Sequence, residues 1–250
     1  MGDLEACSEL SSEELERYSR QILVIGCEGQ LKLKKSRVLV AGAGGLGSAV
    51  LYYLVAAGIG EVVFIDDGVV ELSNLQRQVL YTTEDIGAPK VLVAEKRLRA
   101  LNPHVKLLPV QATITESVLE EHVKNVDVVV DALDNWEARF TLDRVAWRYS
   151  KPLVHAGVGE YYGQLTVIKR GATPCLRCIF RGVKGGERGR VAVVATTPGL
   201  LGLLEVNEVF KIILGVGEPL YNKILVLNGK KPSVEVIEIK GLNCEDVCES

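Results

Sequence analysis

The sequence lacks the features that membrane, secreted and nucleic-acid-binding proteins show. No apolar run approaches the roughly 20 residues that a membrane-spanning helix needs. The amino terminus is acidic and polar, which is the wrong character for a secretory signal. A formal net charge of −3 gives no electrostatic reason to expect nucleic acid or a membrane surface as a partner. These absences predict a soluble protein of the cytoplasm.

Cysteine is also scarce, and its distribution is uneven. Four of the six cysteines form two close pairs, Cys175 with Cys178 and Cys244 with Cys248. In the cytoplasm, close pairs indicate a metal site more than a disulfide. Cys7 and Cys27 have no partner at a suitable spacing, so we interpret the first as a tail residue and the second as ordinary packing. No cysteine occurs from residue 179 to residue 243.

The strongest signal that is present is the stretch from Arg37 to Asp67. Its pattern predicts a strand, a glycine turn, an apolar helix and a second strand, at 37–41, 42–47, 48–57 and 61–65. The turn fits G-x-G-x-x-G with one additional glycine, and its glycines are Gly42, Gly44, Gly45 and Gly47. Such a turn lets the backbone approach a phosphate, which the amino end of the helix then binds. Asp66 ends the second strand, where an acid that binds ribose is expected. The stretch therefore predicts a nucleotide, without specifying which one.

Further polar residues follow the ends of predicted strands, where α/β sheets bind their ligands. The segment after Asp66 contains Asn74 and Arg77, which can point into the nucleotide crevice. Residues 87–90 start a predicted helix that runs to Leu101, with Pro89 in its first turn. Lys90 lies at the positive end of this helix, which favours an anion. Asp134 comes shortly after an apolar strand. Other candidates in the same segments are Asp67, Ser73, Gln78 and Asn135.

The order of the predicted elements indicates a single α/β unit that covers residues 1–250. Leading helices span 11–36, and a Rossmann-like, doubly wound and mostly parallel sheet spans 37–157. Residues 163–169 then alternate as an antiparallel strand does. We therefore expect residues 158–250 to extend the same sheet with antiparallel strands. Neither an internal repeat nor a long linker divides the chain.

With these motifs the chain closely resembles the MoeB/ThiF/HesA family, the bacterial and archaeal relatives of ubiquitin-activating enzymes. The matching segments follow the family order over nearly the whole chain: RYSRQ (17–21), GAGGLG (42–47), IDDGVVELSNLQRQ (65–78), GAPK (87–90), LNPH (101–104), DALDN (131–135), PLVHAGV (152–158) and PGLLGLLEVNEVFKII (198–213). The resemblance implies an ATP-dependent adenylyltransferase that releases pyrophosphate. Its substrate would be the C-terminal glycine of a small ubiquitin-like sulfur carrier protein.

The resemblance also implies roles for the crevice residues. The glycine turn would cradle phosphate, and Asp66 would bind the ribose hydroxyls. Asn74, Arg77 and Lys90 would contact the phosphates and offset their charge. Asp134 would hold Mg²⁺.

Two further expectations concern residues outside the crevice. By family likeness, Arg20 on a leading helix reaches the phosphates of the neighbouring subunit, which implies a homodimer. The cysteine pairs resemble the structural zinc site of the family, although the second pair is C-x-x-x-C and not C-x-x-C. Two close pairs separated by a long gap suit tetrathiolate zinc, and a disulfide or free thiols are the alternatives.

One departure from the family bears on mechanism. Several members carry a further cysteine in the loop before the Pro-Gly helix, and that cysteine attacks the acyl-adenylate or forms a persulfide link. Residues 188–197 contain no cysteine. The enzyme is therefore expected to stop at the acyl-adenylate and to leave sulfur delivery to a separate protein. The basic residues between 181 and 190 either guide an acidic carrier or form a solvated charged surface.

Three other functions compete with this one. A relative that adenylates and cyclises threonylcarbamoyladenosine on transfer RNA shares the ATP site, but the charge of −3 and the paired cysteines favour the carrier protein. A non-catalytic scaffold that binds nucleotide and a ubiquitin-like partner is disfavoured by the intact Arg77, Lys90 and Asp134. An NAD oxidoreductase is disfavoured because none of the three histidines has an evident partner for hydride transfer.

Overall fold

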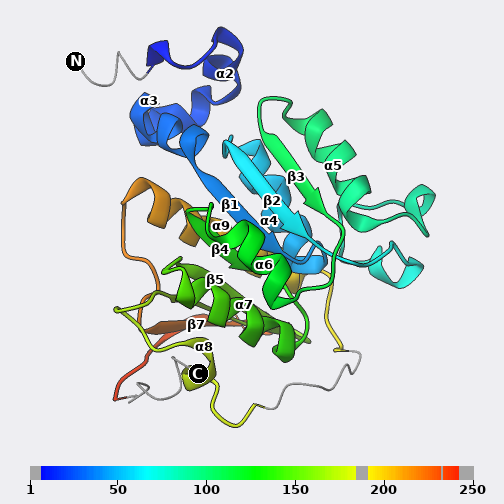
Figure 1. The fold of residues 1–250 in the computed structure, drawn as a ribbon, viewed down its shortest axis with the longest axis vertical. Helices are drawn as coiled ribbons and strands as arrows, with labels where there is room; N and C mark the ends of the chain where they lie inside the picture. Colours follow the sequence, from blue (N-terminus) through cyan, green and yellow to red (C-terminus); the bar gives the residue numbers. More distant parts are fainter. Residues whose placement is uncertain (1–6, 184–190, 232, 242–250) are drawn as a thin grey trace.

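The computed structural model describes residues 7–183, 191–231 and 233–241, and its central element is one eight-stranded sheet (Figure 1). The strand order is β3-β2-β1-β4-β5-β6-β7-β8. Strands β1 to β5 are parallel to one another, and β6 to β8 continue the sheet with antiparallel pairing. The strands are β1 Arg37–Ala41, β2 Glu61–Ile65, β3 Lys106–Val110, β4 Val128–Asp131, β5 Leu153–Gly159, β6 Tyr162–Ile168, β7 Lys223–Asn228 and β8 Ser233–Glu238. The prediction of a mostly parallel α/β sheet with an antiparallel extension is confirmed.

Helices cover both faces of the parallel part of the sheet (Figure 1). Residues of α4, α5 and α9 contribute to the hydrophobic core on one face, and residues of α6 and α7 to the core on the other. The helices are α2 Ser12–Arg17, α3 Ser19–Lys35, α4 Gly45–Ala56, α5 Lys90–Leu101, α6 Glu116–Val123, α7 Trp136–Arg148, α8 Leu176–Ile179 and α9 Thr196–Leu214. Because strands β1 and β4 are covered on both faces, residues 38–41 of β1 and 128–130 of β4 are apolar without alternation.

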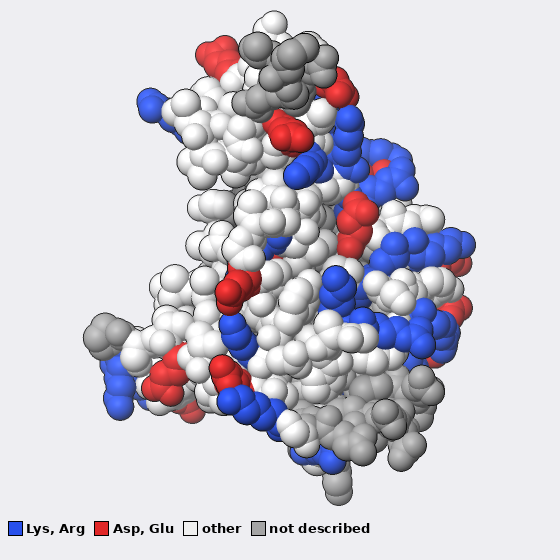
Figure 2. Space-filling model, turned by 90° about the vertical axis from the view of Figure 1, so that its left-hand side faces the viewer, with Lys and Arg blue, Asp and Glu red and all other residues white. Residues whose placement is uncertain are grey.

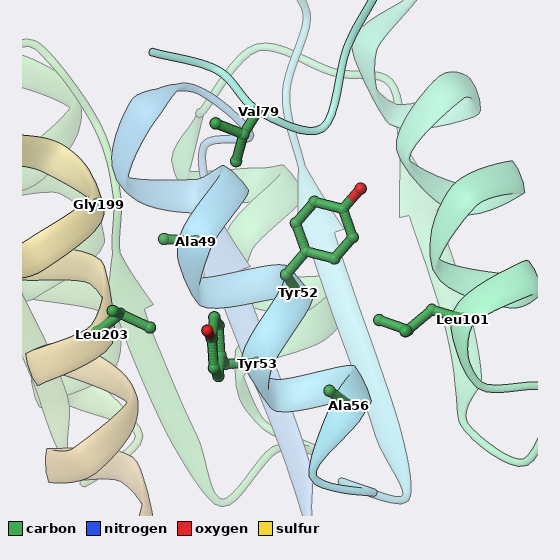
Figure 3. Close-up of a pocket in the computed structure, with 8 residues that line it drawn as sticks. All are labelled: Ala49, Tyr52, Tyr53, Ala56, Val79, Leu101, Gly199 and Leu203. Carbon is green, nitrogen blue, oxygen red and sulfur yellow. The ribbon is translucent and has the colours of Figure 1, made fainter. Parts of the chain in front are cut away.

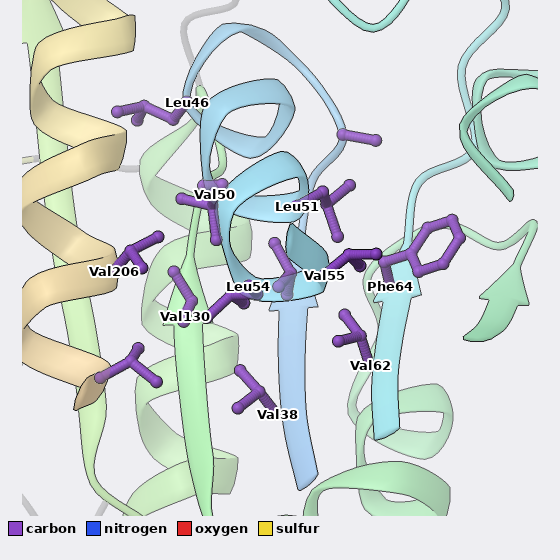
Figure 4. Close-up of a cluster of buried hydrophobic side chains, with 14 of the residues drawn as sticks. Val38, Leu46, Val50, Leu51, Leu54, Val55, Val62, Phe64, Val130 and Val206 are labelled. Carbon is purple, nitrogen blue, oxygen red and sulfur yellow. The ribbon is translucent and has the colours of Figure 1, made fainter. Parts of the chain in front are cut away.

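The larger core lies between the sheet, α4 and α9 (Figure 4). Val38 of β1, Val50 of α4 and Val206 of α9 are all buried in it. Helix α4 is apolar almost all round because it packs on the sheet and on α9 at the same time. A Cβ atom at Gly202 would lie 2.8 Å from the carbonyl oxygen of Leu46. The two helices therefore approach closely because residue 202 has no side chain.

The starts of two helices test the local signals in the sequence. The sequence Ser11-Ser12-Glu13-Glu14 forms a capping box at the start of α2, since Ser11 Oγ accepts from the Glu14 N–H and Glu14 Oε2 accepts from the Ser11 N–H, at 3.2 and 2.8 Å. Helix α4 begins at Gly45, three residues before the predicted start at residue 48. The apolar pattern misses this first turn because two of its residues are glycines without side chains. Part of the glycine turn is thus helical.

The interpretation of Cys7 and Cys27 as residues without partners is wrong. The two form a disulfide, with Cα atoms 5.0 Å apart. Lys34 Nζ lies 2.9 Å from Glu14 Oε2 and 3.1 Å from the carbonyl oxygen of Glu9. The segment around α2 therefore lies along α3, and this brings Cys7 to Cys27. Spacing in the sequence could not reveal the pair, because the contact depends on how the leading helices pack.

On the face shown in Figure 2, basic side chains gather mainly on the right-hand side of the view, with acidic side chains among them. In the part of the chain that the structure describes, no helix is long and apolar enough to cross a bilayer.

Candidate functional site

The predicted crevice lies where the parallel sheet changes winding direction. β1 and β4 are neighbours, and the chain continues to β2 on one side and to β5 on the other. At such a switch point the loops after the two strands diverge and leave room for a ligand. Gly42 after β1 has a φ of 98°, and a Cβ atom there would lie 2.6 Å from the carbonyl oxygen of Ala132 after β4. The glycine turn and the turn after β4 are therefore in direct contact.

The glycine turn leads into α4, whose N-cap, Gly44, makes no side-chain hydrogen bond. The first N–H groups of such a helix are available to an anion. A Cβ atom at Gly45 would lie 3.1 Å from Pro198 and 3.4 Å from Cγ of Arg77. A Cβ atom at Gly47 would lie 2.1 Å from the carbonyl oxygen of Gly42. The glycines thus permit close packing, and Arg77 lies next to the turn as predicted.

Asp66 is tied to the glycine turn by backbone hydrogen bonds. Its Oδ2 accepts from the Ala43 N–H and its Oδ1 from the Gly68 N–H, both at 2.8 Å. A Cβ atom at Gly68 would lie 2.9 Å from Asp66 Oδ1 and 3.2 Å from Nζ of Lys90. The predicted ribose acid and the predicted phosphate lysine therefore lie close together. Asp67 is exposed and accepts from Thr113 Oγ1 at 2.7 Å.

The segment from Ser73 to Gln78 runs beside the turn. Arg77 Nη1 donates to the carbonyl oxygen of Ser73 at 2.9 Å. Asn74 is buried, and its Oδ1 accepts from the Glu71 N–H, so it stabilises the short 3-10 turn Leu72–Asn74. Gln78 is also buried, its Nε2 would lie 3.7 Å from a Cβ atom at Gly44, and its Oε1 has no hydrogen-bond partner within the described residues. A buried amide oxygen without a partner is costly, which favours a ligand contact there.

Asp134 and Asn135 follow β4 and differ in what they contact. Asn135 Oδ1 accepts from the Ala138 N–H at 2.9 Å and caps helix α7. Asp134 is exposed, and its Oδ1 lies 3.4 Å from Asn135 Nδ2. Asp134 makes no ion pair with any other described residue. An exposed carboxylate at the ligand-binding edge fits Mg²⁺, which binds through one or two carboxylates, phosphates and water.

Arg20 is not part of this group of residues. It is exposed near the start of α3, and α3 leads into the beginning of β1, at the end of the sheet opposite to the crevice (Figure 1). The side chain of its neighbour Gln21 is hydrogen-bonded within the same chain, since Nε2 donates to the carbonyl oxygen of Ala57 at 3.0 Å. Within one chain, the structure brings together the other crevice candidates but not Arg20.

The sequence reasoning assigned no role to a buried polar cluster behind the turn. Asp131 ends β4, and its Oδ2 lies 2.7 Å from Nδ1 of His155 on β5, with both residues 0% exposed. Burial lowers the pKa of His155 more than Asp131 raises it, so the neutral imidazole donates from Nδ1. Arg139 of α7 lies beside Asp131, with Nε 3.9 Å from Oδ1. Burial raises the pKa of Glu205 on α9 well above its usual value. The one feature of the sequence that could have indicated this cluster is an acid, Asp131, at the end of an otherwise apolar strand.

The outer side of α4 carries a separate apolar hollow of about 540 Å³ (Figure 3). Ala49, Tyr53 and Ala56 of α4 line it, together with Leu203 of α9 and Leu101 of α5. Among the described residues, its lining carries no charged side chain that could bind a triphosphate. The crevice at the strand ends therefore remains the candidate nucleotide site.

Only half of the predicted zinc site falls within the structure. Cys175 and Cys178, at helix α8, are buried, and Cys244 and Cys248 lie outside the described residues. The described ranges contain no group of three or more metal-binding side chains. Cys178 is disulfide-bonded in the structure, and zinc would require this thiol to be reduced. The tetrathiolate site stays a prediction.

Comparison with known proteins relates the whole chain to one group. The profile of the ThiF family matches residues 18–249. The sulfur carrier protein adenylyltransferase of Thermus thermophilus is 40% identical over 92% of this chain and 89% of its own length. The SAMP-activating enzyme E1 of Haloferax volcanii is 41% identical over 91% and 86%. The solved structure of Escherichia coli MccB with MccA-N7isoASN is 25% identical, with a TM-score of 0.83 over 96% of this chain and 76% of MccB.

Proposed function

The chain belongs to the ThiF family, and on this premise we propose that it is an ATP-dependent adenylyltransferase of a small ubiquitin-like sulfur carrier protein. It activates the C-terminal glycine carboxylate of the carrier and releases pyrophosphate in the cytoplasm. The single observation that supports this best is the convergence of the glycine turn, Arg77 and the Asp134 turn at one edge of the sheet. A separate protein then delivers sulfur to the acyl-adenylate.

The chemistry requires positioning and charge neutralisation more than acid–base catalysis. The carrier carboxylate is already ionised near pH 7, so no general base is needed before it attacks the α-phosphorus. We assign phosphate contacts to the N–H groups of the glycine turn and to Asn74, Arg77 and Lys90. Asp66 binds the ribose hydroxyls through the oxygen lone pairs that do not accept hydrogen bonds from the backbone. Donors fixed in this way stabilise charge that grows on the phosphates.

Magnesium would be held by Asp134, with the phosphates and water as further ligands. When bound, it would neutralise phosphate charge and stabilise the leaving pyrophosphate. Ser73, Gln78, Asp67 and Asn135 complete the proposed nucleotide site at its edges. Of these, Gln78 has the most specific support, because its buried amide oxygen lacks a partner within the described residues.

The first prediction tests the reaction and its end point. With its carrier, the protein is expected to catalyse ATP–pyrophosphate exchange without forming a thioester of its own. Exchange needs only the phosphate site and the bound acyl-adenylate. A thioester needs a thiolate within reach of the acyl carbon, and residues 179–243 contain no cysteine. Exchange is measured with carriers from the same genome, and adducts on a non-reducing gel.

Two results would contradict this prediction. A carrier–enzyme adduct that disappears with added thiol would show that Cys7, Cys27 or a paired cysteine reacts after all. Absence of exchange with every carrier would count against the adenylyltransferase proposal and favour the RNA-modifying relative. A carrier without its last glycine serves as the control, since it has no correctly placed carboxylate and should support no exchange.

We further propose a homodimer in which Arg20 acts on the phosphates of the neighbouring subunit. The support is that Arg20 is exposed on α3, next to Leu23 and Val24, which are 80% and 85% exposed. Arg20→Ala subunits are mixed with Asp134→Ala subunits. Random pairing makes about half of the dimers mixed, and each mixed dimer has one intact site, so up to about a quarter of all sites should be active. Exchange no higher than that of either parent, with mixed dimers shown to form, would refute the shared site.

We also propose one structural zinc ion per chain, bound by Cys175, Cys178, Cys244 and Cys248. Ligation would join the C-terminal residues to α8, so loss of the metal is expected to lower thermal stability more than exchange. The metal content of protein purified under reducing conditions without added zinc is the measurement. A folded, metal-free chain, or a disulfide that persists in reducing buffer, would contradict the site.

A further inference from the structure

The backbone of Leu133 is held by buried charged residues at both of its peptide groups, the one shared with Ala132 and the one shared with Asp134. Its N–H donates to Asp131 Oδ1 at 3.1 Å, and its carbonyl oxygen accepts from Arg139 Nη2 at 2.5 Å. Asp131 is 0% exposed and Arg139 is 6% exposed. His155 donates to the other oxygen of Asp131 and so orients the carboxylate. Two side chains from β4 and α7 thus fix two consecutive peptide groups in the turn between these elements.

A contribution to stability alone is a weak explanation for this arrangement. Removing two charges from water costs several kcal/mol, and a buried ion pair often stabilises a fold no better than apolar residues of similar size. The pair here is also not closely matched, since Arg139 Nε lies 3.9 Å from Asp131 Oδ1. The hydrogen bonds of the two residues to the Leu133 backbone, at 3.1 and 2.5 Å, are shorter than this distance between their charged groups. The arrangement is therefore better suited to fixing the backbone than to pairing the charges.

The residues on either side of Leu133 are those that face the ligand. Ala132 contacts the glycine turn, where a Cβ atom at Gly42 would lie 2.6 Å from its carbonyl oxygen. Asp134, the proposed magnesium ligand, follows directly and has no ion pair among the described residues to hold it. The orientation of Asp134 thus depends on the Leu133 peptide before it and on the Asn135 cap after it. A shift of about 1 Å in such a group can cost on the order of 100-fold in rate.

We propose that Asp131 and Arg139 are positioning residues, which orient the two peptide groups of Leu133 so that Asp134 faces the magnesium and phosphates of bound ATP. The proposal rests on the proposed function, because it takes Asp134 as the magnesium ligand. Neither residue touches the substrate in this scheme. Their effect passes through the backbone of residues 132–134.

Three substitutions separate orientation from stability. Arg139→Met removes the donor to Leu133 and keeps most of the side-chain volume. Arg139→Lys keeps a charge and one donor. The double variant Asp131→Asn/Arg139→Met retains an acceptor for the Leu133 N–H and leaves no buried charge unpaired, so it tests the proposal if Arg139→Met fails to fold. Asp143→Asn is the matched control, since Asp143 is a buried acid on α7 that accepts from the Leu176 N–H.

Two measurements are needed, and one does not depend on turnover. In ATP–pyrophosphate exchange, the double variant should lose about 10- to 100-fold in kcat with little change in KM for the carrier. Arg139→Lys should retain more activity than Arg139→Met. In thermal-shift titrations in the presence of EDTA, ATP should stabilise every variant as much as it stabilises wild type. The additional stabilisation that Mg²⁺ gives to wild type should be reduced in the double variant.

Either of two results would overturn the proposal. One is a folded double variant with wild-type kcat and a wild-type response to Mg²⁺. The other is an equal loss of kcat and of magnesium response in Asp143→Asn, which would indicate a general effect of burial. If wild type shows no exchange with any carrier, the proposed function fails. The thermal shift with magnesium and ATP then still decides whether the pair orients Asp134.

Discussion

Replacing Arg77 by alanine is expected to reduce carrier-dependent ATP–pyrophosphate exchange about 100-fold, comparable to the loss of one fixed donor to a developing negative charge. Arg77 lies against the glycine turn, with Cγ 3.4 Å from the Cβ position of Gly45. Its Nη1 is bound to the carbonyl oxygen of Ser73, which restricts the guanidinium before ATP arrives. A donor that is already ordered needs little rearrangement when the phosphate charge grows.

Exchange rates and ATP affinity should be measured together for this variant. The expected change is mainly in the rate, because the charge that Arg77 offsets is greatest in the transition state. Arg99→Ala is the matched control, since Arg99 is an exposed arginine whose described partner is Glu95 on the same helix. The thermal midpoint shows whether loss of the bond to Ser73 disturbs the fold. An Arg77→Ala protein that folds and exchanges at the wild-type rate would exclude Arg77 from the phosphate site.

Replacing Asp134 by alanine is expected to reduce exchange at least as much, about 100-fold or more, because it removes the proposed anchor for magnesium. Asp134 is exposed and makes no ion pair with other described residues, so the substitution should leave the free energy of unfolding nearly unchanged. A large loss of activity without a loss of stability is what distinguishes a ligand-binding residue from a structural one.

The dependence of exchange on magnesium concentration gives the sharper measurement for Asp134. Asp134→Ala should need more Mg²⁺ for half-maximal exchange, and Asp134→Asn should lie between alanine and wild type because it keeps one oxygen ligand. Glu218→Ala, which removes a carboxylate that is 85% exposed, is the control for surface charge. An unchanged magnesium requirement in Asp134→Ala would place the metal on other residues and would also remove the basis for the role of Asp131 and Arg139.

Much of the fold was predictable because its signals are local. The apolar run that forms most of β4 and the glycine turn depend on nearest neighbours in the chain, and the structure has the predicted elements in the predicted order. The start of α4 was predicted three residues late because Gly45 and Gly47 have no side chains to contribute to a helical pattern. The gathering of the candidate residues at one edge of the sheet was predictable for a related reason, since parallel strands bring their carboxyl ends to one edge.

Contacts between distant segments were not predictable from spacing. The disulfide of Cys7 with Cys27 depends on how the segment around α2 packs along α3. The cluster of Asp131, Arg139 and His155 depends on strand register and on the first turns of α7. In the sequence these three residues look like a strand end, a helix position and a strand position, with no shared pattern.

The sequence by itself determined the winding of the sheet, the position of the glycine turn and the residue types along the edge of the sheet. These features depend on the hydrophobic pattern and on glycines, which act over a few residues. The tertiary structure alone decided which of those side chains meet. It joined Asp66 to the glycine turn and placed Lys90 beside Asp66. Arg20 of the same chain lies at the end of the sheet opposite to the crevice. The physical reason is that backbone conformation is governed by neighbours in sequence, and the chemistry of a site is governed by neighbours in space.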